Sequence, residues 1–102
     1  MDRVANYSGI VQNYLQGKAA IPFSPTVDLR FVAESPAANQ YVLKTVGSQK
    51  GVAVDDTDIH ISIENQKVRV VVDNTEWGVL EELAEAGISR EDLVDATHPI
   101  NS

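Results

Sequence analysis

The sequence predicts a small α+β domain: an N-terminal helix, an antiparallel sheet of about four strands that includes a C-terminal hairpin, then one long and one short C-terminal helix. Three observations lead to this prediction. Apolar residues recur every three or four positions in residues 2–16, alternate with other residues at several places within 27–72, and return to helical spacing in 77–84. With 102 residues, the chain is long enough to form one domain, 1–102, without a metal or a disulfide.

The first predicted element is a helix from about Asp2 to Gln16. Its apolar positions, Tyr7 and Leu15 among them, are spaced so that they form one stripe of an amphipathic helix. Gly17 follows, and a residue without a Cβ is a common C-terminal stop because it enters the left-handed region at little cost. The prolines of the next stretch, AAIPFSPT, favour an ordered connector or an edge segment over the centre of a sheet.

The sheet is predicted from segments in which every second residue is apolar, the period of a half-buried strand. A turn separates the first two segments, GSQKG forms a turn or loop after the second, and the tight connection ENQK makes the last two a hairpin. The segment before ENQK permits either one long strand or two short ones. The predicted strands are residues 27–34, 41–47, one or two strands within 52–64, and 67–72.

The stretch DNTE, directly after the last strand, predicts the start of a helix. With Asp73 as the N-cap, Glu76 becomes the third helical residue, and each carboxylate can accept a bond from an otherwise unpaired amide. Val72 and Trp77 then take the two positions of a hydrophobic staple, and Gly87 ends the helix. The alternative is that Asp73 and Glu76 form a catalytic cluster, but this stretch does not supply the further groups that an enzyme needs.

A second, short helix is predicted over roughly Arg90 to Asp95. Ser89 would be its N-cap and Asp92 its third residue, which repeats the capping arrangement on a smaller scale. Ile88 and Leu93 would form the staple.

Charge and composition narrow the class of function. Eight Lys and Arg against fifteen Asp and Glu give a formal net charge of −7, so the chain lacks the clustered cations with which DNA-binding proteins neutralise phosphates. There are no cysteines, which excludes a Cys-ligated zinc site and a Cys nucleophile. No apolar run approaches the length of a membrane span, and the N-terminal residues do not resemble a signal peptide, so a cytoplasmic protein is expected.

Three acidic residues of the predicted long helix have no local explanation. Glu81 and Glu85 are four residues apart, where like charges repel, and Glu82 and Glu85 lie toward the negative end of the helix dipole. They form either an ordinary solvated face or a docking surface for a basic partner.

An oxygen-rich metal site is a weaker alternative. Asp55, Asp58 and His60 are close in sequence, and Asp58 and His60 would share a face if they lay in one regular strand. The Ca²⁺-loop pattern is absent, and His98, before a proline near the chain end, is not an obvious ligand. No catalytic residue, metal or cofactor is therefore predicted.

Two stretches and their surroundings resemble a known family. DIHISIENQKVRV, DNTEWGVLEELAEAGISREDLV and the HP that follows are similar to the XisI-like proteins, the fdxN element excision controlling factors, and the opening YSGIVQNYL with its following IP also matches. Within that pattern, capping and packing do not account for His60, Gly78 and Glu82. Gly78 falls inside the predicted helix, where glycine costs about 1 kcal/mol relative to alanine, which suggests close approach of another backbone.

The resemblance implies a cyanobacterial accessory protein that controls programmed excision of a DNA element during heterocyst differentiation. It implies action beside a recombinase and an XisH-like companion protein, and that the protein is not itself the recombinase. We therefore expect a non-enzymatic accessory protein that acts by binding another protein. On this hypothesis Glu81, Glu82 and Glu85, with His60 and Gly78, are candidates for partner binding. The alternatives are a direct DNA-binding regulator or a small metal-dependent hydrolase. A free strand edge in so small a sheet also makes a homo-oligomer an expectation.

Overall fold

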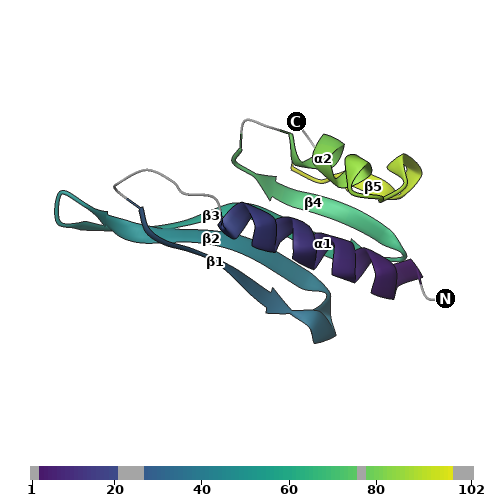
Figure 1. Cartoon of the computed structure of the whole chain (residues 1–102), viewed down its shortest axis with the longest axis horizontal. Coiled ribbons are helices and arrows are strands. Elements are labelled where there is room, and N and C mark those ends of the chain that lie inside the picture. Colours follow the sequence, from purple (N-terminus) through teal and green to yellow (C-terminus); the bar gives the residue numbers. More distant parts are fainter. Residues whose placement is uncertain (1–2, 21–26, 76–77, 98–102) are drawn as a thin grey trace.

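A single sheet runs through the part of the chain that the computed structural model describes, residues 3–20, 27–75 and 78–97 (Figure 1). Within these residues the sheet has five strands in the order β1-β2-β3-β4-β5. The elements in chain order are α1 (Arg3–Ala19), β1 (Val27–Ser35), the 3₁₀ turn η1 (Pro36–Ala38), β2 (Gln40–Gln49), β3 (Val52–Glu64), β4 (Lys67–Asp73), α2 (Val79–Glu85), the 3₁₀ turn η2 (Arg90–Asp92) and β5 (Leu93–Asp95).

The α+β class is confirmed, but the predicted sheet of about four antiparallel strands is wrong. β1 to β4 pair antiparallel, while β5 adds a fifth strand parallel to β4, with Val68 opposite Leu93 and Val70 opposite Asp95. The segment expected to form the short second helix is therefore a 3₁₀ turn followed by a strand. Its backbone groups bond to the free edge of β4, and no local pattern signals a partner more than twenty residues away.

Helix α1 is longer than predicted. It continues through Gly17 to Ala19, and the amide of Ala20 still bonds to the carbonyl of Gln16 at 3.1 Å. Gly17 is therefore not a stop. Ala19 packs against the core as the next member of the apolar stripe, and this tertiary contact outweighs the low helix propensity of glycine.

The β2–β3 and β3–β4 hairpins each have a two-residue turn in which both residues have positive φ. Lys50 and Gly51 have φ of 53° and 79°, and Asn65 and Gln66 have φ of 52° and 63°. Two such residues form the type I′ turn, whose twist matches that of the flanking strands. The predicted ENQK hairpin is thus confirmed, while GSQKG is strand up to Gln49.

The segment that permitted one strand or two forms one long strand, β3. A β-bulge interrupts its pairing with β2: Leu43 lies opposite Ile59 and Lys44 opposite Thr57, so Asp58 is the extra residue of the bulge. An extra residue of this kind shifts the alternation of side chains on its strand.

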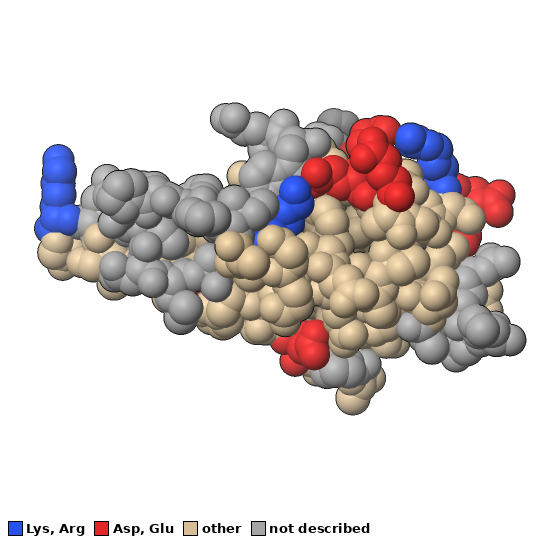
Figure 2. All heavy atoms as spheres, in the orientation of Figure 1, with Lys and Arg blue, Asp and Glu red and all other residues tan. Residues whose placement is uncertain are grey.

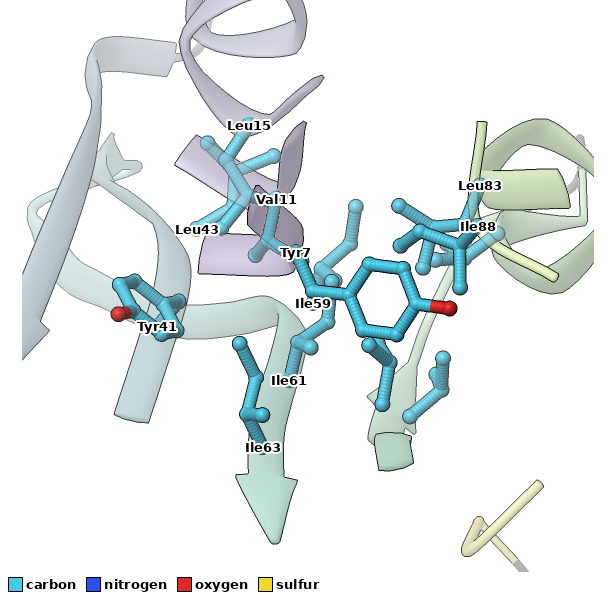
Figure 3. Close-up of a cluster of buried hydrophobic side chains, with 13 residues drawn as sticks. Tyr7, Val11, Leu15, Tyr41, Leu43, Ile59, Ile61, Ile63, Leu83 and Ile88 are labelled. Carbon is cyan, nitrogen blue, oxygen red and sulfur yellow. The ribbon is translucent and has the colours of Figure 1, made fainter. Parts of the chain in front are cut away.

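Both helices pack on the same face of the sheet. α1 packs against β1, β2 and β3, and α2 packs against β4 and β5 (Figure 1). Tyr7, Val11 and Leu15 of α1 point into this core, as the predicted stripe required (Figure 3). The buried apolar side chains are those of Tyr7, Val11, Leu15, Tyr41, Leu43, Ile59, Ile61, Ile63, Val68, Val70, Val79, Leu83 and Ile88.

The C-terminal helix α2 is short, and the predicted long helix from Asp73 is wrong. Its predicted end is confirmed: Gly87 has φ of 120°, its amide bonds to Ala84 O, and the amide of Ile88 bonds to Leu83 O, both at 3.2 Å. These two bonds define a Schellman motif, and Leu83 and Ile88 supply its apolar contact (Figure 3). None of the described helices is long and apolar enough to cross a membrane.

Candidate functional site: the groove between α1 and α2

A shallow groove of about 430 Å³ lies between α1 and α2. Both helices contribute polar side chains to it. Its lining combines residues from the C-terminal half of α1 with the acidic side of α2: Asn13, Tyr14, Gly17, Lys18, Glu82, Glu85 and Ala86.

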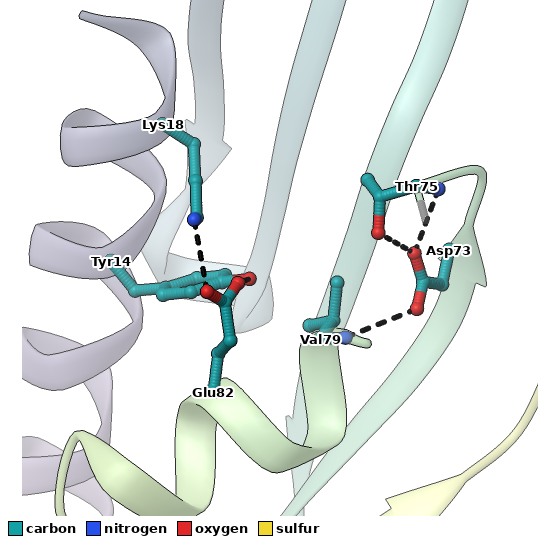
Figure 4. Close-up of polar contacts among 6 residues, drawn as sticks. All are labelled: Tyr14, Lys18, Asp73, Thr75, Val79 and Glu82. Atoms are coloured by element: carbon teal, nitrogen blue, oxygen red, sulfur yellow. Dashed lines mark hydrogen bonds and ion pairs between the residues drawn. The ribbon is translucent and has the colours of Figure 1, made fainter. Parts of the chain in front are cut away.

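Glu82 joins the two helices across this groove (Figure 4). The Tyr14 hydroxyl donates to its Oε1 at 2.7 Å, and the Lys18 ammonium donates to Oε2 at 3.1 Å. The same ammonium lies 5.6 Å from the centroid of the Tyr14 ring, within the range of a cation–π contact. Both carboxylate oxygens of Glu82 are thus engaged inside the chain. This contact explains why an acid stands at a position that the helix dipole disfavours.

Glu81 is also held by a residue of its own chain. Arg90 donates two parallel hydrogen bonds to the two Glu81 oxygens, each of 2.9 Å, and so fastens α2 to the turn η2. These bonds, reinforced by the charge of Arg90, hold the pKa of Glu81 below its usual value of 4.5. Arg90 attracts Glu85 as well, and this relieves the repulsion expected between acids four residues apart.

The Glu81–Arg90 pair predicts a measurable pH effect. Because the folded-state pKa of Glu81 is the lower one, its contribution to stability is present above pH 4.5 and is lost as the pH falls through the folded-state pKa. An NMR titration of the Glu81 carboxyl carbon should give a midpoint below 4.5 that rises in Arg90→Gln and at high salt. The same midpoint in wild type and Arg90→Gln would contradict the pairing.

Glu85 differs from Glu81 and Glu82 in its exposure and contacts. It lines the groove, and its side chain is exposed. Acidic side chains gather over the α2 end of the molecule, with a basic side chain beside them (Figure 2). Of the three predicted docking residues, Glu85 is therefore the one that presents its charge to solvent without a direct bond to its own chain among the described residues.

Asp73 accepts a hydrogen bond from the start of α2, but it is not the N-cap residue that the sequence predicts. Its Oδ1 accepts bonds from the amide of Thr75, at 2.9 Å, and from the Thr75 hydroxyl, while Oδ2 accepts the amide of Val79 at 3.2 Å (Figure 4). Val79 is the first helical residue, so the carboxylate does satisfy one otherwise unpaired amide. Glu76, its expected partner in the capping box, and Trp77 lie outside the described residues.

The residue at the N-cap of α2 is Gly78, with φ of 80°. The prediction of a helix-interior glycine in contact with another backbone is wrong: a Cβ built at Gly78 meets nothing within 4 Å. Glycine is suited to this position because the left-handed conformation costs other residues about 1 kcal/mol or more.

Ser89 precedes η2 but makes no side-chain capping bond. Asp92, its expected partner, is instead a buried carboxylate, only 5% exposed. It accepts a 2.6 Å hydrogen bond from the Tyr7 hydroxyl and lies 3.6 Å from the Lys67 ammonium. Asp92 therefore links α1, β4 and η2, which its place in the sequence did not indicate.

The structure separates the three candidate metal ligands. The bulge turns Asp58 toward the buried Thr45, whose hydroxyl it accepts, on the face covered by α1. His60 lies on the opposite face and bonds through Nε2 to Gln40 Oε1 at 2.7 Å, while Asp55 is paired with Lys44 at 2.7 Å. No group of three His, Asp or Glu side chains suited to a metal occurs in the described part of the chain. His98 lies outside it.

Sequence reasoning missed the partners of Glu82 and Asp92. Tyr14 and Lys18 are four residues apart and so share a face of α1, which marks them as a possible pair. Nothing in the sequence connects them with Glu82, which is 68 residues from Tyr14. Such contacts depend on how the two helices are placed on the sheet.

Two solved structures from Anabaena variabilis ATCC 29413 share this fold. A XisI-like protein has a TM-score of 0.85 and 24% sequence identity, over 94% of this chain and 88% of that one. The fdxN element excision controlling factor XisI has a TM-score of 0.78 and 19% identity, over 98% and 97% of the two chains. Curated proteins yield no match.

At sequence identities of 24% and 19%, the similarity to these two structures shows a shared fold. The sequence comparison goes further, because the family model described as XisI protein matches residues 1–102. The match includes both helices that form the groove and the strands that carry them. The resemblance seen in the sequence motifs is thereby confirmed, and the chain belongs to the XisI protein family.

Proposed function

We propose that this chain is a non-enzymatic accessory factor in the programmed, site-specific excision of a DNA element, and that it acts by binding a protein partner. Membership of the XisI family carries the link to excision, since a structural neighbour is named as an fdxN element excision controlling factor. The proposed partner is an XisH-like companion protein or the recombinase itself.

The charge distribution supports a protein partner over DNA. The described cations that are paired with carboxylates are Lys18, Lys44, Lys67, Arg69 and Arg90. A phosphate backbone would have to compete with these carboxylates, in a chain whose formal net charge is −7. The separation of Asp55, Asp58 and His60 likewise gives no support to a metal-dependent hydrolase.

Glu85 is the proposed contact for a basic segment of the partner. Glu82 stabilises the position of α1 and Glu81 that of η2, so charge reversal at either residue would disturb the fold as well as the surface. Glu85, exposed on the rim of the groove, allows the surface to be tested alone.

The experiment is a binding titration of the full-length chain with the purified XisH-like protein. Glu85→Lys should weaken binding about tenfold, because it replaces an attraction by a repulsion at close range. The matched control is Glu34→Lys, an equal charge change at an exposed position on β1, and it should change the affinity less than about twofold. Circular dichroism should show both variants folded.

Equal affinity for Glu85→Lys and wild type would contradict the proposed surface. No binding by wild type, together with binding to DNA that weakens steeply as salt is added, would contradict the protein partner altogether.

A further inference from the structure

The sheet has a second face, turned away from α1 and α2. Direct cross-strand partners have side chains on the same side of a sheet, so one row on this face runs from Ala33 through Val42 and His60 to Val72. Phe31 on β1, opposite Lys44, and Val94 on β5, opposite Arg69, lie on the same face. We call this surface the open face, because no described helix lies over it.

The open face is more apolar than a solvated sheet surface needs to be. Antiparallel sheets with one face exposed to solvent have apolar residues on the core face and polar residues on the exposed face. Here valines stand at outward positions on β2, β4 and β5. His60, the polar residue at the centre of the row, has its Nε2 bonded to Gln40 at 2.7 Å, so covering it would not remove that hydrogen bond.

The charged side chains of the open face are paired. Lys44 pairs with Asp55 at 2.7 Å and Arg69 with Glu64 at 3.1 Å. Lys67, which the register also places on this face opposite Glu64, lies 3.6 Å from the Asp92 carboxylate. The chain as a whole carries −7, so most approaches between two copies are repulsive. Two such acidic molecules can approach through the open face because its carboxylates are paired with cations.

The size of the open face suits a dimer. Strands β1 to β4 over about seven residues each, and the three-residue β5, spaced about 4.8 Å apart, give a flat area of about 480 Å² per copy and about 960 Å² for two. Side-chain relief raises the accessible area above this figure, and specific interfaces bury more than about 1,000 Å² in total. Two sheets packed face to face, about 10 Å apart, are a common arrangement in proteins.

We propose that the open face is where two copies of this chain associate, with β3 of each copy near the twofold axis. Another route to a dimer is edge pairing through β1 or β5. Glu34 is exposed on β1 and Asp95 on β5, and a charge on an edge strand disfavours such pairing.

The first test is the mass in solution of the full chain at high micromolar concentration, by light scattering after gel filtration. Wild type should give twice the chain mass of 11.1 kDa, and Val42→Lys, which places a charge on the open face, should give the single-chain mass. The matched control is Val52→Lys at the tip of the β2–β3 hairpin, where Val52 is 66% exposed; it should stay dimeric. A monomeric wild type, or a dimeric Val42→Lys, would overturn the proposal.

A second test does not depend on how well Val42→Lys folds. The chain has no cysteine, so His60→Cys introduces one thiol near the proposed axis and Val52→Cys one far from it. A short bismaleimide should cross-link His60→Cys into dimers and leave Val52→Cys single. Cross-linking of Val52→Cys alone, or of neither variant, would place the contact elsewhere and overturn the proposal.

Discussion

Replacing Ile61 with alanine is expected to lower the free energy of unfolding by about 3 to 4 kcal/mol. Ile61 is fully buried on β3, opposite Tyr41 on β2 and Val70 on β4, beneath α1. Truncation removes apolar contact and leaves a cavity that the surrounding strands cannot close. Urea denaturation followed by circular dichroism measures the change, and Ile61→Val should lose only about 1 kcal/mol.

The control for this effect is Val52→Ala, because Val52 is 66% exposed at the hairpin tip. It should change stability by less than about 0.5 kcal/mol. A loss below about 1 kcal/mol for Ile61→Ala would mean that the core is not centred on β3.

Replacing Asp92 with alanine should cost about 2 to 3 kcal/mol. The substitution leaves the Tyr7 hydroxyl, on a side chain only 4% exposed, without the carboxylate to which it donates. It also removes the acid beside the Lys67 ammonium. Because Asp92 joins α1 to the turn before β5, the loss should appear as global destabilisation, measured by urea denaturation.

A double-mutant cycle isolates the hydrogen bond itself. Tyr7→Phe removes the donor and should cost about 1 kcal/mol, and the double variant should cost less than the sum of the two single changes by about 1 to 2 kcal/mol. Strictly additive losses would show that Tyr7 and Asp92 do not interact in solution.

Much of the fold could be predicted because its signals are local. The stripe of α1, the alternation in β1 to β4 and the two-residue turn at Asn65 and Gln66 each lie within a few consecutive residues. Gly87 ended α2 as expected, since the left-handed conformation that closes a Schellman motif favours glycine.

The candidate site was less predictable. The sequence marked Glu81, Glu82 and Glu85 as acids without a local explanation, and the structure supplies one for two of them through Lys18, Tyr14 and Arg90. A capping box and a helix were expected at Asp73, yet that carboxylate reaches the first helical amide across a loop. Periodicity places residues on a face, but it does not say what that face meets.

The sequence by itself determined the class of this protein: the α+β pattern, the acidic balance and the motifs that identify the XisI family. Only the tertiary structure decided the parallel fifth strand, the bulge that parts Asp58 from His60, and the partners of Glu82 and Asp92. The physical reason is how far apart in the sequence the interacting residues lie. Turns, caps and amphipathic stripes arise from neighbours along the chain, whereas sheet-edge pairing and buried ion pairs form between segments that only the folded chain brings together.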